Sequence, residues 1–258
     1  WEVATQLKPL DDNRFYAPDT YYFLDSPTIV GEVDWRRWTS TSGDRDYTIE
    51  IAMLHEGTDE ELDRYQEWVA KVVEEQKEIF GELPDFDFGR YTFLCGYNPW
   101  VRGDGMEHRN STVCTSQGNL AEHADRLIGT ISHEFFHAWN VERLRPRNLE
   151  PFDFDHANVS DALWFAEGFT SYYDDLVLCR AGIRSQTDYV EGLNGTLNFV
   201  ANSPGRLHRG PAAMSRLAPF VDAAASIDRN NFENTFISYY SYGAVIGLVL
   251  DLSLRTRY

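Results

Sequence analysis

The pattern His133-Glu134-Phe135-Phe136-His137 constrains this chain more than any other segment. Residues four positions apart share one face of a helix, so both imidazoles can reach the same ion. Glu134 is rotated by about 100° from His133, so its carboxylate can approach a water on that ion without being a ligand. Apolar residues suited to one side of a helix precede and interrupt the pattern, namely Leu127, Ile128, Ile131, Phe135 and Phe136. The pattern therefore predicts a helix that carries part of a metal site.

The same five residues are also compatible with two surface histidines and a glutamate. A catalytic zinc site takes three protein ligands and keeps one position open for water. The extended pattern with a third histidine six residues after the second fails, because that position is Arg143. The third ligand must therefore come from another segment.

Glu167 is the best candidate for that ligand. It is the one acid in the apolar and aromatic stretch Leu163-Trp164-Phe165-Ala166-Glu167-Gly168-Phe169. Burying an unpaired carboxylate is costly, and metal coordination removes that cost. The alternative is an ion pair with a nearby arginine. We expect this helix to begin at a cap formed by Ser160 or Asp161 and to end at Gly182.

Composition and charge exclude several classes of protein. The chain has 258 residues, 43% of them hydrophobic, which is enough for a packed core and excludes general disorder. Its 23 basic and 41 acidic residues give a net charge of −18, which argues against nucleic acid and anionic lipid as partners. No apolar run reaches the ~20 residues of a membrane span, and the nearest, 243–254, contains Asp251. Three cysteines cannot form a disulfide scaffold, so the cysteine count does not indicate in which cellular compartment the protein works. The sequence leaves the oligomeric state open as well.

The order of predicted elements indicates an α+β fold. Residues 1–118 read mostly as strands with one long helix, whose capping box is Thr58 with Glu61 and whose end is Gly81. Residues 119–258 read mostly as helices, at about 121–140, 160–181, 185–201 and 239–255. We expect a small mixed sheet followed by a mainly helical lobe, in one domain.

Individual strands are predicted from apolar runs and alternation. These are an aromatic strand at 21–24, an alternating strand at 47–54, a buried strand at 91–95 and a short edge strand at 111–115, with a loop at 96–105. Cys95 and Cys114 fall in neighbouring strands. They can pair or remain buried free thiols, and the free state is favoured.

Two segments together resemble the gluzincin metallopeptidases, and among these the glycyl aminopeptidase family, whose members often carry a PDZ domain after the catalytic domain. The segments are 133–146, HEFFHAWNVERLRP, and 163–173, LWFAEGFTSYY. The resemblance covers most of the chain, with supporting pieces at 25–27 (DSP) and 80–84 (FGELP). It implies a thermolysin-like catalytic domain over 1–258 with one zinc ion. His133, His137 and Glu167 would hold the zinc, and Glu134 would be the general base and proton shuttle.

Related enzymes also carry an all-β domain before the catalytic domain. Neither that domain nor a PDZ domain is visible in these 258 residues. We therefore expect the chain to be one domain of a longer protein.

Residues 102–111 resemble the substrate-amine loop of gluzincin aminopeptidases, a loop of the Gly-x-x-Glu type, and Gly105 and Glu107 are its candidate substrate-binding residues here. An edge strand binds an extended peptide by main-chain pairing, and a carboxylate at its end can then meet the free α-ammonium. Glu107 would be that carboxylate; the alternative is that it is an ordinary exposed acid in a loop. Better-known members have Asn where this chain has His108, so the role of His108 stays open between substrate contact and plain loop residue.

Tyr240 is expected to bind the oxyanion of the tetrahedral intermediate. Related enzymes place a tyrosine three residues before a glycine in the last helix, and these positions are Tyr240 and Gly243. A tyrosine hydroxyl there donates a hydrogen bond to the developing charge. Tyr239 and Tyr242 remain alternatives, and a simple aromatic cluster is the other interpretation. The lysine-type residue of the family just before that glycine is Tyr242 here.

Polar residues around the ligands are candidates for orienting them. Ligating histidines usually donate their second N–H to a carboxylate or carbonyl. Asp174, seven residues after Glu167, and Asn140 are the leading candidates, followed by Arg143 and Arg145; surface ion pairing is the alternative for each.

The sequence thus predicts a zinc aminopeptidase that acts on peptides with a free N-terminus. The preference for N-terminal Gly or Ala follows only from the resemblance. The alternatives are a gluzincin endopeptidase or other zinc hydrolase, and a zinc-stabilised peptide-binding module without turnover.

Overall fold

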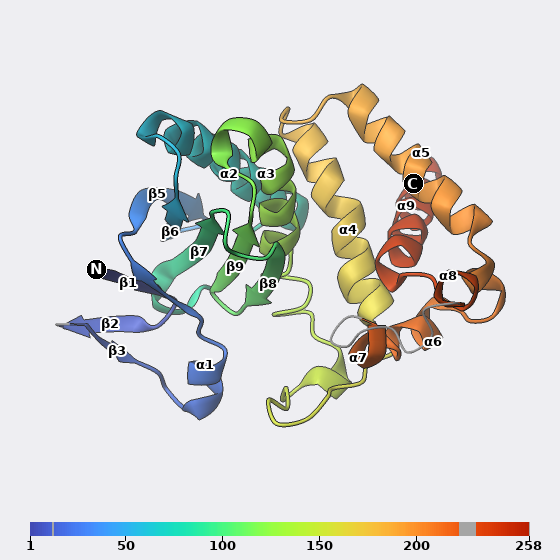
Figure 1. Ribbon diagram of the computed structural model, residues 1–258, viewed down its shortest axis with the longest axis horizontal. Helices are drawn as coiled ribbons and strands as arrows, with labels where there is room; N and C mark the ends of the chain where they lie inside the picture. Colours follow the sequence, from blue (N-terminus) through green and yellow to red (C-terminus); the bar gives the residue numbers. More distant parts are fainter. Residues whose placement is uncertain (12, 222–230, 258) are drawn as a thin grey trace. The chain divides into compact units, whose positions relative to one another are not determined.

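The computed structural model describes residues 1–11, 13–221 and 231–257. The chain forms two compact units, Trp1–Arg143 and Leu144–Tyr258 (Figure 1). The first unit holds the strands and also the helix with the histidine pattern. Residues 119–143 therefore lie with the sheet, whereas the sequence grouped them with the helices.

A five-stranded mixed sheet forms the centre of the first unit. Its order is β5-β6-β7-β9-β8. The pairs β6–β7 and β7–β9 are parallel, and the pairs β5–β6 and β8–β9 are antiparallel. The bounds are β5 Asp34–Ser42, β6 Arg45–His55, β7 Arg90–Tyr97, β8 Asp104–His108 and β9 Ser111–Ser116. The predicted strands at 47–54 and 91–95 are confirmed as parts of β6 and β7.

The edge strand differs from the prediction. Residues 111–115 were expected at the edge, but β9 lies between β7 and β8. Among the described strands, β8 is the edge next to β9, although its first two residues were expected in a loop. Its sequence Asp-Gly-Met-Glu-His contains poor strand formers, so its extended state comes from pairing with β9 and not from local preference.

Two helices pack beside this sheet, α2 (Asp59–Phe80) and α3 (Leu120–Phe136). The capping box of Thr58 and Glu61 is confirmed, and Gly81 ends α2 with a φ of 84°. The aromatic core fixes α3: Phe135 meets the Tyr91 ring edge-on with centroids 4.9 Å apart. Phe80 of α2 stacks on Trp139 just after α3, with centroids 4.4 Å apart. The helix with the histidines is therefore held firmly against the sheet.

The remainder of the first unit consists of two small strand pairs and a short helix. β1 (Glu2–Thr5) pairs with β4 (Thr28–Gly31), and β2 (Lys8–Asp11) pairs with β3 (Arg14–Tyr16). The strand predicted at 21–24 is wrong, because these residues form α1 (Thr20–Leu24). Asp19 caps this helix by accepting a hydrogen bond from the Tyr22 N–H at 2.8 Å, which outweighs the strand preference of the tyrosines. A 3₁₀ turn, η1 (Asp87–Gly89), precedes β7.

The second unit is helical. Its elements are η2 (Arg147–Leu149), α4 (Leu163–Arg180), α5 (Gln186–Asn202), η3 (Pro204–Leu207), α6 (Pro211–Ser215), α7 (Ala218–Val221), α8 (Phe232–Thr235) and α9 (Tyr239–Arg257). The three long helices match the predictions within a few residues. α4 and α9 cross where Gly168 meets Gly243: a Cβ added at Gly168 would lie 2.7 Å from the Gly243 carbonyl carbon. The two backbones touch there, so neither position accepts a side chain.

The start of α4 differs from the prediction of a cap at Ser160 or Asp161. The N-cap residue is Ala162, which has no side-chain cap. Instead, the Ser215 hydroxyl of α6 accepts the Trp164 N–H at 2.9 Å. A distant side chain thus does what a local cap usually does. The end is as predicted, with Gly182 in the left-handed region (φ 69°) just after α4.

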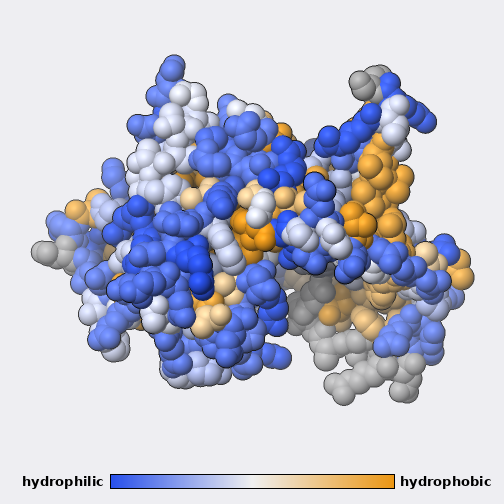
Figure 2. Space-filling model, turned by 90° about the horizontal axis from the view of Figure 1, so that it is seen from above, coloured by the Kyte–Doolittle hydropathy of each residue, from blue (hydrophilic) through white to orange (hydrophobic). Residues whose placement is uncertain are grey.

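Apolar surface gathers over the second unit (Figure 2), where Val249, Leu250, Leu252 and Leu254 of α9 are about half exposed. By length and mean hydropathy (1.3), the segment Phe232–Arg257 could cross a membrane. Helices in the core of soluble proteins reach the same length and hydropathy. α9 packs against α4, α5 and α6, and its Asp251 accepts a hydrogen bond from the Tyr172 hydroxyl at 2.8 Å.

The cysteines are free. Cys95 and Cys114 are buried and opposite each other in the β7–β9 register, and Cys179 is partly buried. Burial, followed by the neighbouring Cys95, raises the pKa of the Cys114 thiol well above its ordinary value. It therefore remains a protonated, unreactive thiol.

Candidate metal centre

The two pattern histidines face the same side at the end of α3. His133 and Glu134 lie in the last turn, and His137 is the C-cap residue. The imidazole centroids of His133 and His137 are 4.9 Å apart and their planes are inclined by 78°. Glu134 is 6% exposed and His137 is 1% exposed. This arrangement gives two nitrogen ligands and a carboxylate beside them.

The His137 ring is oriented by the backbone. Its Nδ1 lies 2.5 Å from the carbonyl oxygen of Asn140. In the tautomer in which Nδ1–H donates to that carbonyl, Nε2 keeps its lone pair for a metal. Asn140 was predicted to orient a ligand, and it is the main chain of Asn140 that contacts His137. The donor geometry of His137 fits a zinc ligand.

Gln76 supports α3 from the side of α2. Its amide nitrogen donates a hydrogen bond to the Ser132 carbonyl at 2.7 Å, and the Gln76 side chain is fully buried. Ser132 directly precedes His133. This bond fixes the turn of α3 that carries His133, and no local sequence pattern indicates it, because Gln76 lies 56 positions before Ser132.

Edge strand β8 brings Glu107 to the same place. One possible ligand atom from each of Glu107, Glu134 and His137 lies within 4.8 Å of the others. Gly105, two residues earlier on β8, lies against α3: a Cβ added there would be 2.7 Å from Glu134 Cδ and 2.9 Å from Thr130 Cγ2. Only glycine allows β8 to approach the Glu134 carboxylate this closely.

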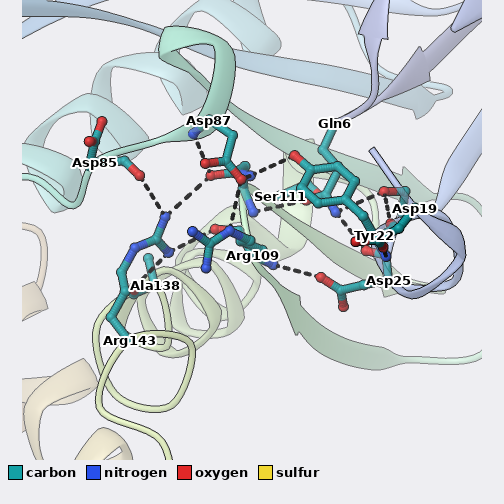
Figure 3. Close-up of polar contacts among 12 residues, drawn as sticks. Gln6, Asp19, Tyr22, Asp25, Asp85, Asp87, Arg109, Ser111, Ala138 and Arg143 are labelled. Carbon is teal, nitrogen blue, oxygen red and sulfur yellow. Dashed lines mark hydrogen bonds and ion pairs between the residues drawn. The ribbon is translucent and has the colours of Figure 1, made fainter. Parts of the chain in front are cut away.

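The His108 side chain packs against another part of the first unit. Its Nδ1 lies 2.9 Å from Asp25 Oδ1, and Asp25 Oδ2 accepts the Arg109 N–H at 3.2 Å. Asp25 therefore holds the β8–β9 turn from the end of α1 (Figure 3). Asp25 of the DSP segment, which is a supporting part of the resemblance, thus contacts the two residues that follow Glu107.

Asn110 joins Tyr22, Asp87 and Arg143, which Figure 3 labels, in one polar network. Its amide nitrogen donates to the Tyr22 hydroxyl at 2.9 Å and to Asp87 at 3.0 Å. Its Oδ1 accepts from the Asp87 N–H and from Arg143. Arg143 also donates to three carbonyls, those of Asp85, Arg109 and Ala138. The network ties the β8–β9 turn to the loop after α3.

The charges in this network shift several pKa values. Burial raises the pKa of the Asp87 carboxyl, but hydrogen bonds from Arg109 and Asn110 outweigh it, so the net pKa lies below the ordinary value. Burial, followed by the Asp87 charge, raises the pKa of Tyr22 to about 12. Burial and the nearby Arg109 lower the pKa of the Arg143 guanidinium. Asp87 is thus a carboxylate at neutral pH, and the Tyr22 hydroxyl keeps its proton.

The remaining predicted residues lie in the second unit. Glu167 is in the second turn of α4, and Asp174 follows seven residues later on the same helix. Tyr239 is 2% exposed in a core cluster with Val200, Met214 and Ile237. Tyr240 and Tyr242 are partly buried and pack against the same cluster. Arg145 pairs with Glu150 at 3.3 Å.

Residues 126–246 match the family model described as M61 glycyl aminopeptidase. The match spans the histidine pattern, the α4 acid and the start of α9. It confirms the resemblance that the sequence indicated. No curated protein matches the chain.

Solved structures share the fold. An aminopeptidase N family protein from Idiomarina loihiensis is 28% identical with a TM-score of 0.81, covering 99% of this chain and 44% of that one. An M1 zinc metallopeptidase mutant from Deinococcus radiodurans is 17% identical with a TM-score of 0.52, covering 98% and 50%. A mutant of the Deinococcus radiodurans M1 zinc metallopeptidase bound to a Tyr-Ser-Ala substrate is 15% identical with a TM-score of 0.51, covering 97% and 50%.

Each of these structures is longer than this chain, which spans half or less of their length. The fold is the α+β fold of the thermolysin-like zinc metallopeptidases.

Proposed function

On the match to the M61 glycyl aminopeptidase family, we propose that residues 1–258 form the catalytic domain of a zinc aminopeptidase. The observation that carries this proposal is the position of Glu107. Its carboxylate lies beside Glu134 and His137 at the end of edge strand β8. A negative charge there can bind the α-ammonium of a peptide.

One zinc ion would be held by His133, His137 and Glu167. Two imidazoles and a carboxylate leave a fourth position for water, as in catalytic zinc sites. The orientation of His137 supports this donor set, and so does Glu167, which is the one acid among the apolar and aromatic residues of the first two turns of α4. When bound, zinc lowers the pKa of its water toward ~7 and polarises the scissile carbonyl.

Glu134 would be the general base. It takes a proton from the attacking water and passes it to the leaving amine. Its carboxylate is nearly buried under β8, beside the glycine that leaves room for it. A carboxylate that is not itself a ligand is the group this step needs.

Pairing along β8 explains why cleavage would occur at the first peptide bond. A peptide added to the free edge of β8 pairs with it residue by residue. If its amine meets Glu107, its first residue lies opposite Met106 and its second opposite Gly105. The first peptide bond then lies near Gly105, and Glu134 lies directly beneath that residue. This register favours an aminopeptidase over an endopeptidase.

Three finer points complete the proposal. The Tyr240 hydroxyl would donate a hydrogen bond to the oxyanion. Tyr240 lies one helical turn before Gly243, whose backbone contact with Gly168 fixes α9 against α4. The family match supports small first residues, Gly or Ala, as the preferred substrates. Asp174 would orient a ligand from α4.

The test is hydrolysis of Gly- and Ala-arylamides, with N-acetylated versions as controls. We expect release of arylamine from the free-amine substrates only, and loss of release with retained zinc in Glu134→Gln. Equal cleavage of acetylated substrates would support an endopeptidase instead. Zinc binding without any hydrolysis would support a peptide-binding module.

A further inference from the structure

The loop that leads into β8 presents two exposed side chains at the end of the edge strand. The loop runs from Asn98 to Gly103, and its Trp100 is 75% exposed. Arg102 is also exposed. Tryptophan and arginine are among the residues enriched at binding hot spots, so this pair is suited to contact a peptide bound along β8.

The loop is fixed at both of its ends. The Asn98 N–H donates to the carbonyl of Ser116 at 3.1 Å, and the Thr115 hydroxyl donates to the Arg102 carbonyl at 2.6 Å. Both partners belong to β9. The Val101 N–H closes a turn onto the Asn98 carbonyl at 3.4 Å, with Trp100 inside that turn. The loop therefore crosses the end of β9 and continues directly into the edge strand.

The register along β8 determines which part of a substrate reaches this loop. This step rests on the proposed function, with the amine at Glu107 and the first residue opposite Met106. Antiparallel pairing then sets the third residue opposite Asp104, the fourth opposite Gly103 and the fifth opposite Arg102. At about 3.4 Å per residue, the peptide reaches the loop within its first five residues.

We propose that Trp100 and Arg102 form a distal subsite for the third to fifth residues of peptide substrates. The indole ring of Trp100 takes an apolar or aromatic side chain at these positions. The guanidinium of Arg102 pairs with the terminal carboxylate of peptides about five residues long. The carboxyl end of such a peptide carries a negative charge, and Arg102 is an exposed cation in a chain whose net charge is −18.

The experiment compares substrates that reach the loop with one that does not. The short substrate is glycine 4-nitroanilide, and the long ones are Gly-Ala-Ala-Phe-Ala with a free carboxylate and the same peptide as its amide. We expect Trp100→Ala to lower kcat/KM for the pentapeptide at least fivefold more than for the anilide, mainly through KM. We expect Arg102→Gln to remove most of the preference for the free carboxylate over the amide.

Matched controls come from the same unit. Trp1 is a second exposed tryptophan (92%), and Arg64 is an exposed arginine on α2. Trp1→Ala and Arg64→Gln should leave the ratio of pentapeptide to anilide activity unchanged. If Trp100→Ala also leaves this ratio unchanged, the subsite does not exist.

A binding measurement separates this inference from the proposed function. In the Glu134→Gln background, calorimetry with the pentapeptide should give a dissociation constant that Trp100→Ala raises at least fivefold. Trp100→Phe should give an intermediate value, which distinguishes the lost ring from a misfolded loop. An unchanged dissociation constant overturns the subsite whether or not the wild-type chain hydrolyses peptides. Absence of hydrolysis in the wild type would overturn only the proposed function.

Discussion

Gly105 on β8 and Glu134 on α3 are in such close contact that no side chain fits between them. A Cβ at Gly105 would lie 2.7 Å from the Glu134 carboxyl carbon and 2.9 Å from Thr130. The edge strand and the general base of the proposed mechanism are thus positioned against each other directly. This contact links substrate pairing to the chemical step.

Gly105→Ala should therefore lower peptidase activity strongly, although the substitution adds only one methyl group. The added methyl must displace the Glu134 carboxylate or push β8 away from α3, and overpacking of this kind costs about 1–3 kcal/mol. We expect kcat/KM for Ala-arylamide to fall at least tenfold. Gly103→Ala is the control, because its Cβ would meet only the Thr115 carbonyl at an ordinary 3.8 Å. Equal activity of both variants would contradict the role of the contact.

Glu107→Gln should weaken the binding of substrates with a free amine. Hydrogen bonds to charged groups contribute about 1.5–3 kcal/mol, so KM should rise roughly ten- to hundredfold. Activity on acetylated peptides, however low, should not fall further, because these lack the ammonium. Kinetics on matched free and acetylated peptides measure both effects. A uniform fall on the two substrates would assign Glu107 to another task, such as metal binding.

Asp87→Asn should change stability in a way that depends on pH. The folded pKa of Asp87 lies below its unfolded value of about 3.9, because Arg109 and Asn110 stabilise the carboxylate. Its contribution to the free energy of unfolding is therefore complete above about pH 5 and is lost as pH falls through the folded pKa. Urea unfolding should show wild type more stable than Asp87→Asn at pH 7, with the difference shrinking toward pH 3. A difference that grew on acidification would have the wrong sign.

Gly168→Ala should destabilise the second unit, because its methyl would collide with Gly243 on α9. The two helix backbones must then separate, and overpacking of this kind lowers the free energy of unfolding by about 1–3 kcal/mol or more. Gly192→Ala on α5 is the matched control, since its Cβ meets nothing within 4 Å. The control should stabilise the chain by up to ~1 kcal/mol through helix propensity. Thermal unfolding of the two variants would decide, and a stable Gly168→Ala would contradict the close crossing.

The helices were predictable because their signals are local. The Thr58–Glu61 box and Gly81 mark the ends of α2 within the sequence itself. Strand β8 was missed because Gly105 and its acidic neighbours do not favour a strand, and only pairing with β9 makes these residues extended. α1 was predicted as a strand because its aromatic residues favour strands, whereas its one local helix signal is the N-cap residue Asp19.

The same distinction between local and distant signals applies to the site. The spacing of His133 and His137 follows from helix geometry, and the sequence was enough to predict it. The bond between His108 and Asp25 joins positions 83 residues apart, so no spacing rule could predict it. Gln76 and Asn110 were overlooked for the same reason, because a buried amide has no sequence signature until its partners are known.

The most direct test of the central claim is zinc content with coordination measured by X-ray absorption on the purified chain. We predict one zinc per chain with two imidazole nitrogens and a carboxylate oxygen, and loss of the carboxylate signal together with most of the zinc in Glu167→Ala. Glu107→Ala should keep the zinc. Zinc that survives Glu167→Ala with unchanged coordination, or that is lost in Glu107→Ala, would contradict the proposed ligand set.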